Sequence, residues 1–171
     1  MGRNTAAAEV TRRWRVMAVI AAVAAVAVGA SVGPAGAVGA LGVGSDFNGD
    51  GYADLAISIP FETLGSGQEG GAVQVLYGSS TGLIAVAGHL WSQNYAGIAD
   101  TAEHGDWFGK AVTTGDFDGD GFTDLAIGVP AEDFVAGNTN DGVVHVLYGS
   151  TVGLTPTGSQ IWSQDNAGIP G

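Results

Sequence analysis

The chain has 171 residues and a formal net charge of −12, with 17 acidic residues against five lysines and arginines. Phosphate groups are bound by Lys and Arg, so this acidic balance argues against nucleic acids and anionic lipids as partners. The chain has no cysteine, so no disulfide stabilises its fold.

The first 37 residues are typical of an export signal. Four arginines precede an apolar run of alanine and valine from about Val16 to Val28, and Ala35-Gly36-Ala37 has the spacing of a signal peptidase site. The run is shorter than the roughly 20 residues of a membrane span. We expect cleavage near Ala37, a secreted or cell-surface protein and no membrane span after cleavage; a retained anchor is the alternative. The composition suggests bacterial export, by the general secretory route or, given Arg12-Arg13, the twin-arginine route.

A nine-residue acidic loop comes next, and it occurs twice. Asp46–Asp54 returns 70 residues later as Asp116–Asp124. Each copy has oxygen-bearing side chains at positions 1, 3, 5 and 9, glycine at 4 and 6, and an aromatic residue at 7. Calcium prefers six or more such oxygens, and position 7 would add its backbone carbonyl. We predict two calcium sites, with the ligands Asp46, Asn48, Asp50, Tyr52 and Asp54 in the first and Asp116, Asp118, Asp120, Phe122 and Asp124 in the second.

The loop has two other interpretations. An EF-hand loop closes with a glutamate at position 12, on a helix, whereas this chain has Ile57 and Ile127 there, inside strand-like segments. An Asp/Asn/Gly-rich turn without a metal is the second alternative, because these residues favour tight turns. The repetition of all four oxygen positions and both glycines favours the metal.

The repeat extends well beyond the loop. Apolar and small residues alternate after each copy, which predicts strands over 54–60 and 124–130. Gly71–Ser79 then matches Gly142–Ser150, and Trp91-Ser92-Gln93 matches Trp162-Ser163-Gln164. Four short strands per unit indicate a propeller blade. We predict an all-β chain with two four-stranded antiparallel blades of an incomplete β-propeller. The expected domains are a signal peptide over 1–37, an N-terminally incomplete blade over 38–100 and a second blade over 101–171.

The residues that flank the second loop resemble those of a known family. Phe108-Gly109 precedes the second loop and Gly128-Val129-Pro130 follows it, as in the FG-GAP repeat of the integrin alpha-chain propeller. The resemblance covers residues 41–171 and implies that the calcium loop joins the first two strands at one face. It implies that the connections Phe61–Gly70, Asn94–Trp107 and Ala131–Asp141 lie on the opposite face, where ligands bind.

The chain also departs from the family. Leu41-Gly42 stands where the first copy would have Phe-Gly. Integrin-type propellers close with about seven blades, and two blades cannot close a ring. We therefore expect a fragment of a longer propeller, or assembly with further blades or other copies.

No catalytic motif is present in the sequence. His89, His104 and His145 are scattered, Glu103–Asp106 is typical of a polar inter-blade loop, and Trp91 and Trp162 favour blade packing over a ligand platform. We predict a non-enzymatic, calcium-binding adhesion or ligand-binding module whose ligand is a protein or a carbohydrate. The alternative is a non-catalytic propeller segment of a secreted hydrolase resembling glycosylphosphatidylinositol-specific phospholipase D.

Overall fold

The structure is a computed structural model that describes residues 45–64, 69–133 and 140–169. The signal peptide predicted for residues 1–37 lies outside these residues. The described part consists of strands and connections, and within it no helix is long and apolar enough to cross a membrane.

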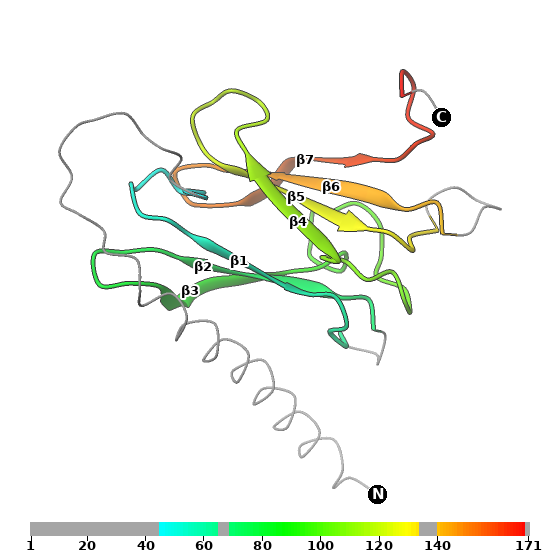
Figure 1. The fold of residues 1–171 in the computed structure, drawn as a ribbon, viewed down its shortest axis with the longest axis horizontal. Coiled ribbons are helices and arrows are strands. Elements are labelled where there is room, and N and C mark those ends of the chain that lie inside the picture. Colours follow the sequence, from blue (N-terminus) through cyan, green and yellow to red (C-terminus); the bar gives the residue numbers. More distant parts are fainter. Residues whose placement is uncertain (1–44, 65–68, 134–139, 170–171) are drawn as a thin grey trace, which may run out of the picture. The chain divides into compact units, whose positions relative to one another are not determined.

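The strands form two antiparallel sheets, each in chain order (Figure 1). The first sheet contains β1 (Leu55–Ile59), β2 (Ala72–Tyr77) and β3 (Ile84–Trp91). The second contains β4 (Ala111–Gly115), β5 (Asp124–Val129), β6 (Val143–Tyr148) and β7 (Thr155–Trp162). The predicted all-β class and antiparallel blades are confirmed. The strand expected to lead into the first loop would precede residue 45, outside the described residues.

The two sheets repeat the same strand register. Trp91 lies opposite Val73 in the first sheet, and Trp162 lies opposite Val144 in the second. In both sheets the register then shifts just before a terminal tyrosine, which is Tyr77 at the end of β2 and Tyr148 at the end of β6. The matched sequences therefore fold into matched strands, down to the position of the irregularity.

One hydrophobic core draws side chains from both sheets. β2 is buried along its whole length, and Leu125, Ile127 and Val129 are buried on one face of β5, as the period of two requires. Phe47 and Phe108, which lie outside the strands, belong to the same cluster. Each blade thus buries apolar surface against the other, and this burial is the main stabilising contribution.

The Phe-Gly pair before β4 forms the centre of the blade junction. Phe108 is fully buried, and its N–H donates to the Gly70 carbonyl at 2.8 Å. Gly109 has a φ of 86°, and a β-carbon there would lie 2.8 Å from Cγ2 of Val73. Its N–H donates to the Gly128 carbonyl at 3.1 Å. Only glycine fits here, because the backbone is left-handed and the neighbouring blade lies against it.

Candidate metal centres

The Asp46 carboxylate organises the first acidic loop. Its Oδ1 accepts the N–H of Gly49 at 2.7 Å and that of Asp50 at 3.2 Å, while its Oδ2 accepts the N–H of Gly51 at 2.9 Å. Gly49 and Gly51 have φ values of 70° and 85°, which side-chain-bearing residues rarely adopt. The glycines at positions 4 and 6 therefore allow the backbone to curl around one carboxylate.

The aspartate at position 9 ties the loop to the sheet. Asp54 is buried; its Oδ2 accepts the Phe47 N–H at 2.7 Å, and its Oδ1 accepts the Gly78 N–H at 2.8 Å. Burial raises the pKa of Asp54, as do the carboxylates of Asp46 and Asp50, while the two hydrogen bonds oppose the rise. Asp54 thus joins both ends of the loop to the end of β2.

The second loop repeats this hydrogen-bond pattern. Asp116 accepts N–H groups from Gly119, Asp120 and Gly121 at 2.8, 3.1 and 3.1 Å. Asp124 accepts the N–H groups of Phe117 and Gly149 at 2.7 and 2.8 Å. Because these hydrogen bonds agree closely with those of the first loop, the two loops have the same local conformation.

The loops differ at position 3. The Asn48 amide donates to Asp50 Oδ2 at 3.0 Å, whereas Asp118 has no amide to donate. Carboxylate oxygens of Asp116, Asp118 and Asp120 lie within 4.8 Å of one another. Desolvation and the neighbouring carboxylates raise the pKa of Asp118, and its hydrogen bond from the Asp120 N–H opposes the rise. The second loop therefore concentrates more negative charge than the first.

The oxygen set of the second loop fits a calcium ion. Calcium holds oxygen ligands at about 2.3–2.6 Å, so two ligands of one ion lie no more than about 5 Å apart. The three exposed carboxylates meet this limit. Bound calcium would supply the positive charge that offsets their repulsion. The first loop has the same backbone and one charge fewer.

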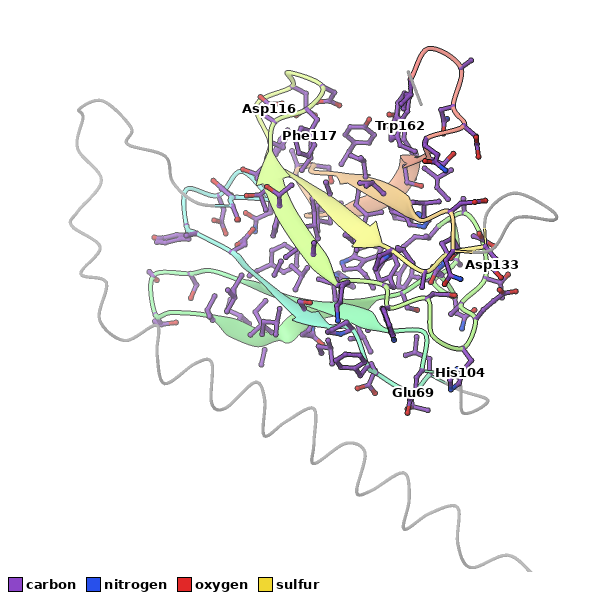
Figure 2. The ribbon with its side chains drawn as sticks, turned by 45° about the vertical axis from the view of Figure 1, so that its right-hand side comes forward. Glu69, His104, Asp116, Phe117, Asp133 and Trp162 are labelled. Atoms are coloured by element: carbon purple, nitrogen blue, oxygen red, sulfur yellow. The ribbon has the colours of Figure 1, made fainter. Side chains whose placement is uncertain are left out.

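The two loops touch each other. A β-carbon on Gly49 would lie 2.6 Å from Cε1 of Phe122, so the aromatic ring at position 7 of the second loop covers position 4 of the first. The Ser150 N–H donates to the Phe47 carbonyl at 3.1 Å. The predicted ligand positions are thus brought to one end of the molecule, where Figure 2 shows Asp116 and Phe117.

Three described residues of the predicted ligand-binding connections lie at the other end. Figure 2 shows His104, Asp133 and Glu69 far from the acidic loop of Asp116. His145 lies inside the fold, where it is buried 5.5 Å from the Phe108 ring, centroid to centroid. Burial lowers the pKa of His145 to about 4. A buried neutral imidazole in the core agrees with the structural interpretation of this histidine.

Sequence reasoning missed one group of polar residues at this end. Glu103 and Asp106 were assigned to a polar loop, yet Asp106 is buried, together with Glu132 and Gln93. The Gln93 amide donates to a Glu132 carboxylate oxygen across the blade junction. A signal was present, because Gln93 and Glu132 each have a repeat partner, Gln164 and Glu62.

Comparison with known proteins identifies the repeat. A family model of the FG-GAP repeat matches residues 37–76 and 108–147. The chain contains two FG-GAP repeats. The two FG-GAP repeats include the two acidic loops, and the second repeat begins at the buried Phe108.

Its relatives are much longer proteins. The chain is 34% identical to mouse phosphatidylinositol-glycan-specific phospholipase D over 110 residues, which are 64% of this chain and 12% of the phospholipase. It is 34% identical to Drosophila melanogaster integrin alpha-PS5 over 119 residues, 69% of this chain and 10% of the integrin. It is 30% identical to human integrin alpha-7 over 129 residues, 73% of this chain and 9% of the integrin. The chain thus spans about a tenth of the length of these relatives.

Proposed function

We propose that this propeller module is exported, binds two calcium ions and serves adhesion or ligand binding without being an enzyme. The proposal is supported by one observation: the carboxylates of Asp46 and Asp116 accept hydrogen bonds from matching backbone N–H groups. The two acidic loops therefore have the same structure. Each ion would be held by positions 1, 3, 5, 7 and 9 of its loop. The ligands proposed are Asp46, Asn48, Asp50, Tyr52 and Asp54 for one ion, and Asp116, Asp118, Asp120, Phe122 and Asp124 for the other.

Calcium would stabilise the fold where no disulfide is available. Of the residues after 37, 16 are acidic and Lys110 alone is basic, and seven of the aspartates belong to the two loops. A bound cation removes part of this self-repulsion and adds binding free energy to the folded state. At free calcium about tenfold above the dissociation constant, each site adds about 1.4 kcal/mol.

The exposed face of the second sheet, around Val144 and Trp162, fits a further blade as its partner. Trp91 is 1% exposed and Val73 0%, whereas their repeat partners Trp162 and Val144 are each 41% exposed. Val144, Trp162, Gln164 and Ile169 line one hollow on the uncovered face. Since the second blade covers this face in the first repeat, a third blade of the same type, or a second copy of this chain, would cover it in the second.

The proposal also includes the predicted domains and the export of the chain. The signal peptide would occupy residues 1–37, the first blade 38–100 and the second 101–171. Cleavage near Ala37 would release an acidic module outside the cell, where calcium is abundant. Its ligand would be a protein or a carbohydrate held by the connections opposite the calcium loops.

The similarity to the phospholipase D favours a second function. In that case the module is a non-catalytic propeller segment attached to a secreted hydrolase. A hydrolase domain encoded in the same reading frame would support this function over a free-standing adhesion module. Both functions use the same calcium loops.

Thermal unfolding of the whole chain tests the calcium sites. We expect millimolar calcium to raise the melting temperature and a chelator to reverse the rise. The variant Asp50→Asn/Asp120→Asn keeps the Oδ1 atoms that accept the N–H groups of Tyr52 and Phe122, and removes one charge from each loop. It should lose most of the calcium-dependent rise. Asp165→Asn, an exposed change outside the loops, should keep it. An equal rise in all three proteins would exclude the loops as the sites.

Panels of immobilised proteins and carbohydrates test the binding function. We expect retention of the chain on a subset of them in calcium and release by the chelator. Retention that is equal in calcium and chelator would separate ligand binding from the metal, and no retention on any panel would contradict the adhesion proposal.

A further inference from the structure

A second acidic cluster lies at the blade junction, away from the calcium loops. Gln93 follows β3, Glu103 and Asp106 lie between β3 and β4, and Glu132 follows β5. Carboxylate oxygens of Glu103, Asp106 and Glu132 lie within 4.8 Å of one another. In Figure 2, His104 and Asp133, the sequence neighbours of this cluster, are at the opposite end from Asp116. The cluster therefore cannot share an ion with either hairpin loop.

Three of its four side chains are almost completely withdrawn from water. Gln93 is 1% exposed, Glu132 1% and Asp106 2%, while Glu103 is exposed at the rim. The Gln93 Nε2 donates to Glu132 Oε2, but the Gln93 Oε1 is buried and accepts no hydrogen bond from the residues the structure describes. A buried amide oxygen without a partner is rare in folded proteins. This oxygen belongs to the amide whose Nε2 contacts the Glu132 carboxylate, so the cluster includes a buried oxygen without a partner.

The described part of the chain supplies no cation to these carboxylates. No lysine, arginine or histidine there forms an ion pair with them, and Lys110, the only lysine, lies over the rings of Phe61 and Trp107 at 4.8 and 4.9 Å. Carboxylates buried at this spacing repel one another when they are ionised, and a bound cation offsets that repulsion.

We propose that Gln93, Glu103, Asp106 and Glu132 bind a third calcium ion, which cross-links the two blades. The carboxylate spacing is within the ligand spacing of about 5 Å that calcium allows. A half-turn of the Gln93 amide exchanges Nε2 and Oε1, so that a carbonyl oxygen facing the ion replaces the hydrogen bond to Glu132. The ligands are all hard oxygens, which favour calcium or magnesium over softer metals.

Cation-binding stoichiometry tests the proposal. The whole chain is dialysed against saturating calcium, and bound calcium is counted for wild type, Glu132→Gln and Asp133→Asn. Asp133→Asn removes the same charge from the exposed neighbouring residue. We expect Glu132→Gln to bind one ion fewer than wild type and Asp133→Asn to bind the same number. Equal numbers in all three proteins would overturn the third site.

Loop variants separate this proposal from the hairpin sites. Asp50→Asn/Asp120→Asn should lower calcium binding at the loops and leave the third ion bound. Failure of the loop proposal would appear as unchanged binding in this variant, and failure of the third site as unchanged binding in Glu132→Gln. The two outcomes are therefore distinguishable in one experiment.

Terbium luminescence gives a second readout. Terbium replaces calcium and emits when a nearby aromatic side chain transfers energy to it. With selective excitation of tryptophan, Tyr52 of the first loop is silent; Trp107 directly follows Asp106, and neither acidic loop contains tryptophan. If Glu132→Gln does not melt cooperatively, Glu103→Gln replaces it, because Glu103 lies at the exposed rim. We expect Glu103→Gln to weaken terbium binding, followed through this emission, by about tenfold. An emission titration unchanged by Glu103→Gln would overturn the proposal.

Discussion

Asp46 and Thr123 bind each other through a reciprocal pair of hydrogen bonds across the blade junction. The Thr123 N–H donates to the Asp46 carbonyl at 3.0 Å, and the Asp46 N–H donates to Thr123 Oγ1 at 3.1 Å. Asp46 begins the first acidic loop, and Thr123 stands at position 8 of the second. The two loops therefore form one unit, and a change in one loop is expected to reach the other.

Thr123→Ala tests this connection. The substitution removes the Oγ1 acceptor and keeps the backbone donor, and the first repeat already has Ala53 at the matched position. We expect a loss of about 1 kcal/mol in the free energy of unfolding, measured by urea unfolding, and weaker calcium binding in the first loop. Ala53→Thr, at an exposed position, should change the unfolding free energy little. Equal effects of both variants would argue against the connection.

The glycines at position 4 of the two loops provide a matched pair. Gly49 and Gly119 have similar φ values of 70° and 79°, but Phe122 covers Gly49 and nothing lies within 4 Å of a β-carbon on Gly119. Gly119→Ala should cost about 1–2 kcal/mol for the left-handed backbone. Gly49→Ala should cost about 1–3 kcal/mol more, because it also displaces the Phe122 ring. Chemical denaturation measures both costs, and equal costs would show that Phe122 moves freely.

His145 is expected to make the fold sensitive to mild acid. Its pKa is about 4 in the folded chain, below the value of about 6.5 in an unfolded one. Between these values the unfolded chain binds the proton more readily, so stability is complete above pH ~6.5 and falls as the pH drops toward ~4. Asp100 opposes the shift. The loss should be about 3 kcal/mol, because each pKa unit corresponds to about 1.4 kcal/mol.

His145→Gln is the matched control for this acid sensitivity, because Gln74 occupies the same place in the first repeat. Unfolding free energies between pH 7 and pH 4 should fall less steeply in the variant than in wild type. Parallel pH profiles of the two proteins would assign the acid sensitivity to the carboxylates instead.

The uncovered face of the second blade is expected to drive association. Val144→Glu places a charge in the hollow beside Trp162 and should shift the chain toward monomer in analytical ultracentrifugation, because burying the carboxylate is unfavourable. Val152→Glu, at a position 79% exposed and outside the hollow, should not alter the distribution. A wild-type chain that remains monomeric at all concentrations would contradict association through this face.

Local patterns in the sequence predicted most of the fold. The alternation after each loop predicted the segments that became β1 and β5, and the matched Gly71–Ser79 and Gly142–Ser150 contain β2 and β6. The outer strands end at Trp91 and Trp162, as the repeated Trp-Ser-Gln indicated. These features depend on neighbours only a few residues apart, which a single sequence displays directly.

The repeated sequence does not show which of two matched residues is buried. Trp91 and Trp162 have the same sequence surroundings and were predicted to pack alike. Trp91, however, is 1% exposed in the core cluster that also contains residues of the second blade, whereas Trp162 is 41% exposed. Exposure depends on what lies beyond the strand, and this information is not contained in the local pattern.

The sequence by itself determined the two acidic loops, the strand periods and the repeat, because each arises from spacing within a short segment. Tertiary structure alone paired Asp46 with Thr123, 77 residues away, and Gln93 with Glu132, 39 residues away. It also turned a polar inter-blade loop into a buried carboxylate cluster. Such pairs form only when the second blade folds against the first, since packing of distant segments, rather than local preference, brings their atoms together.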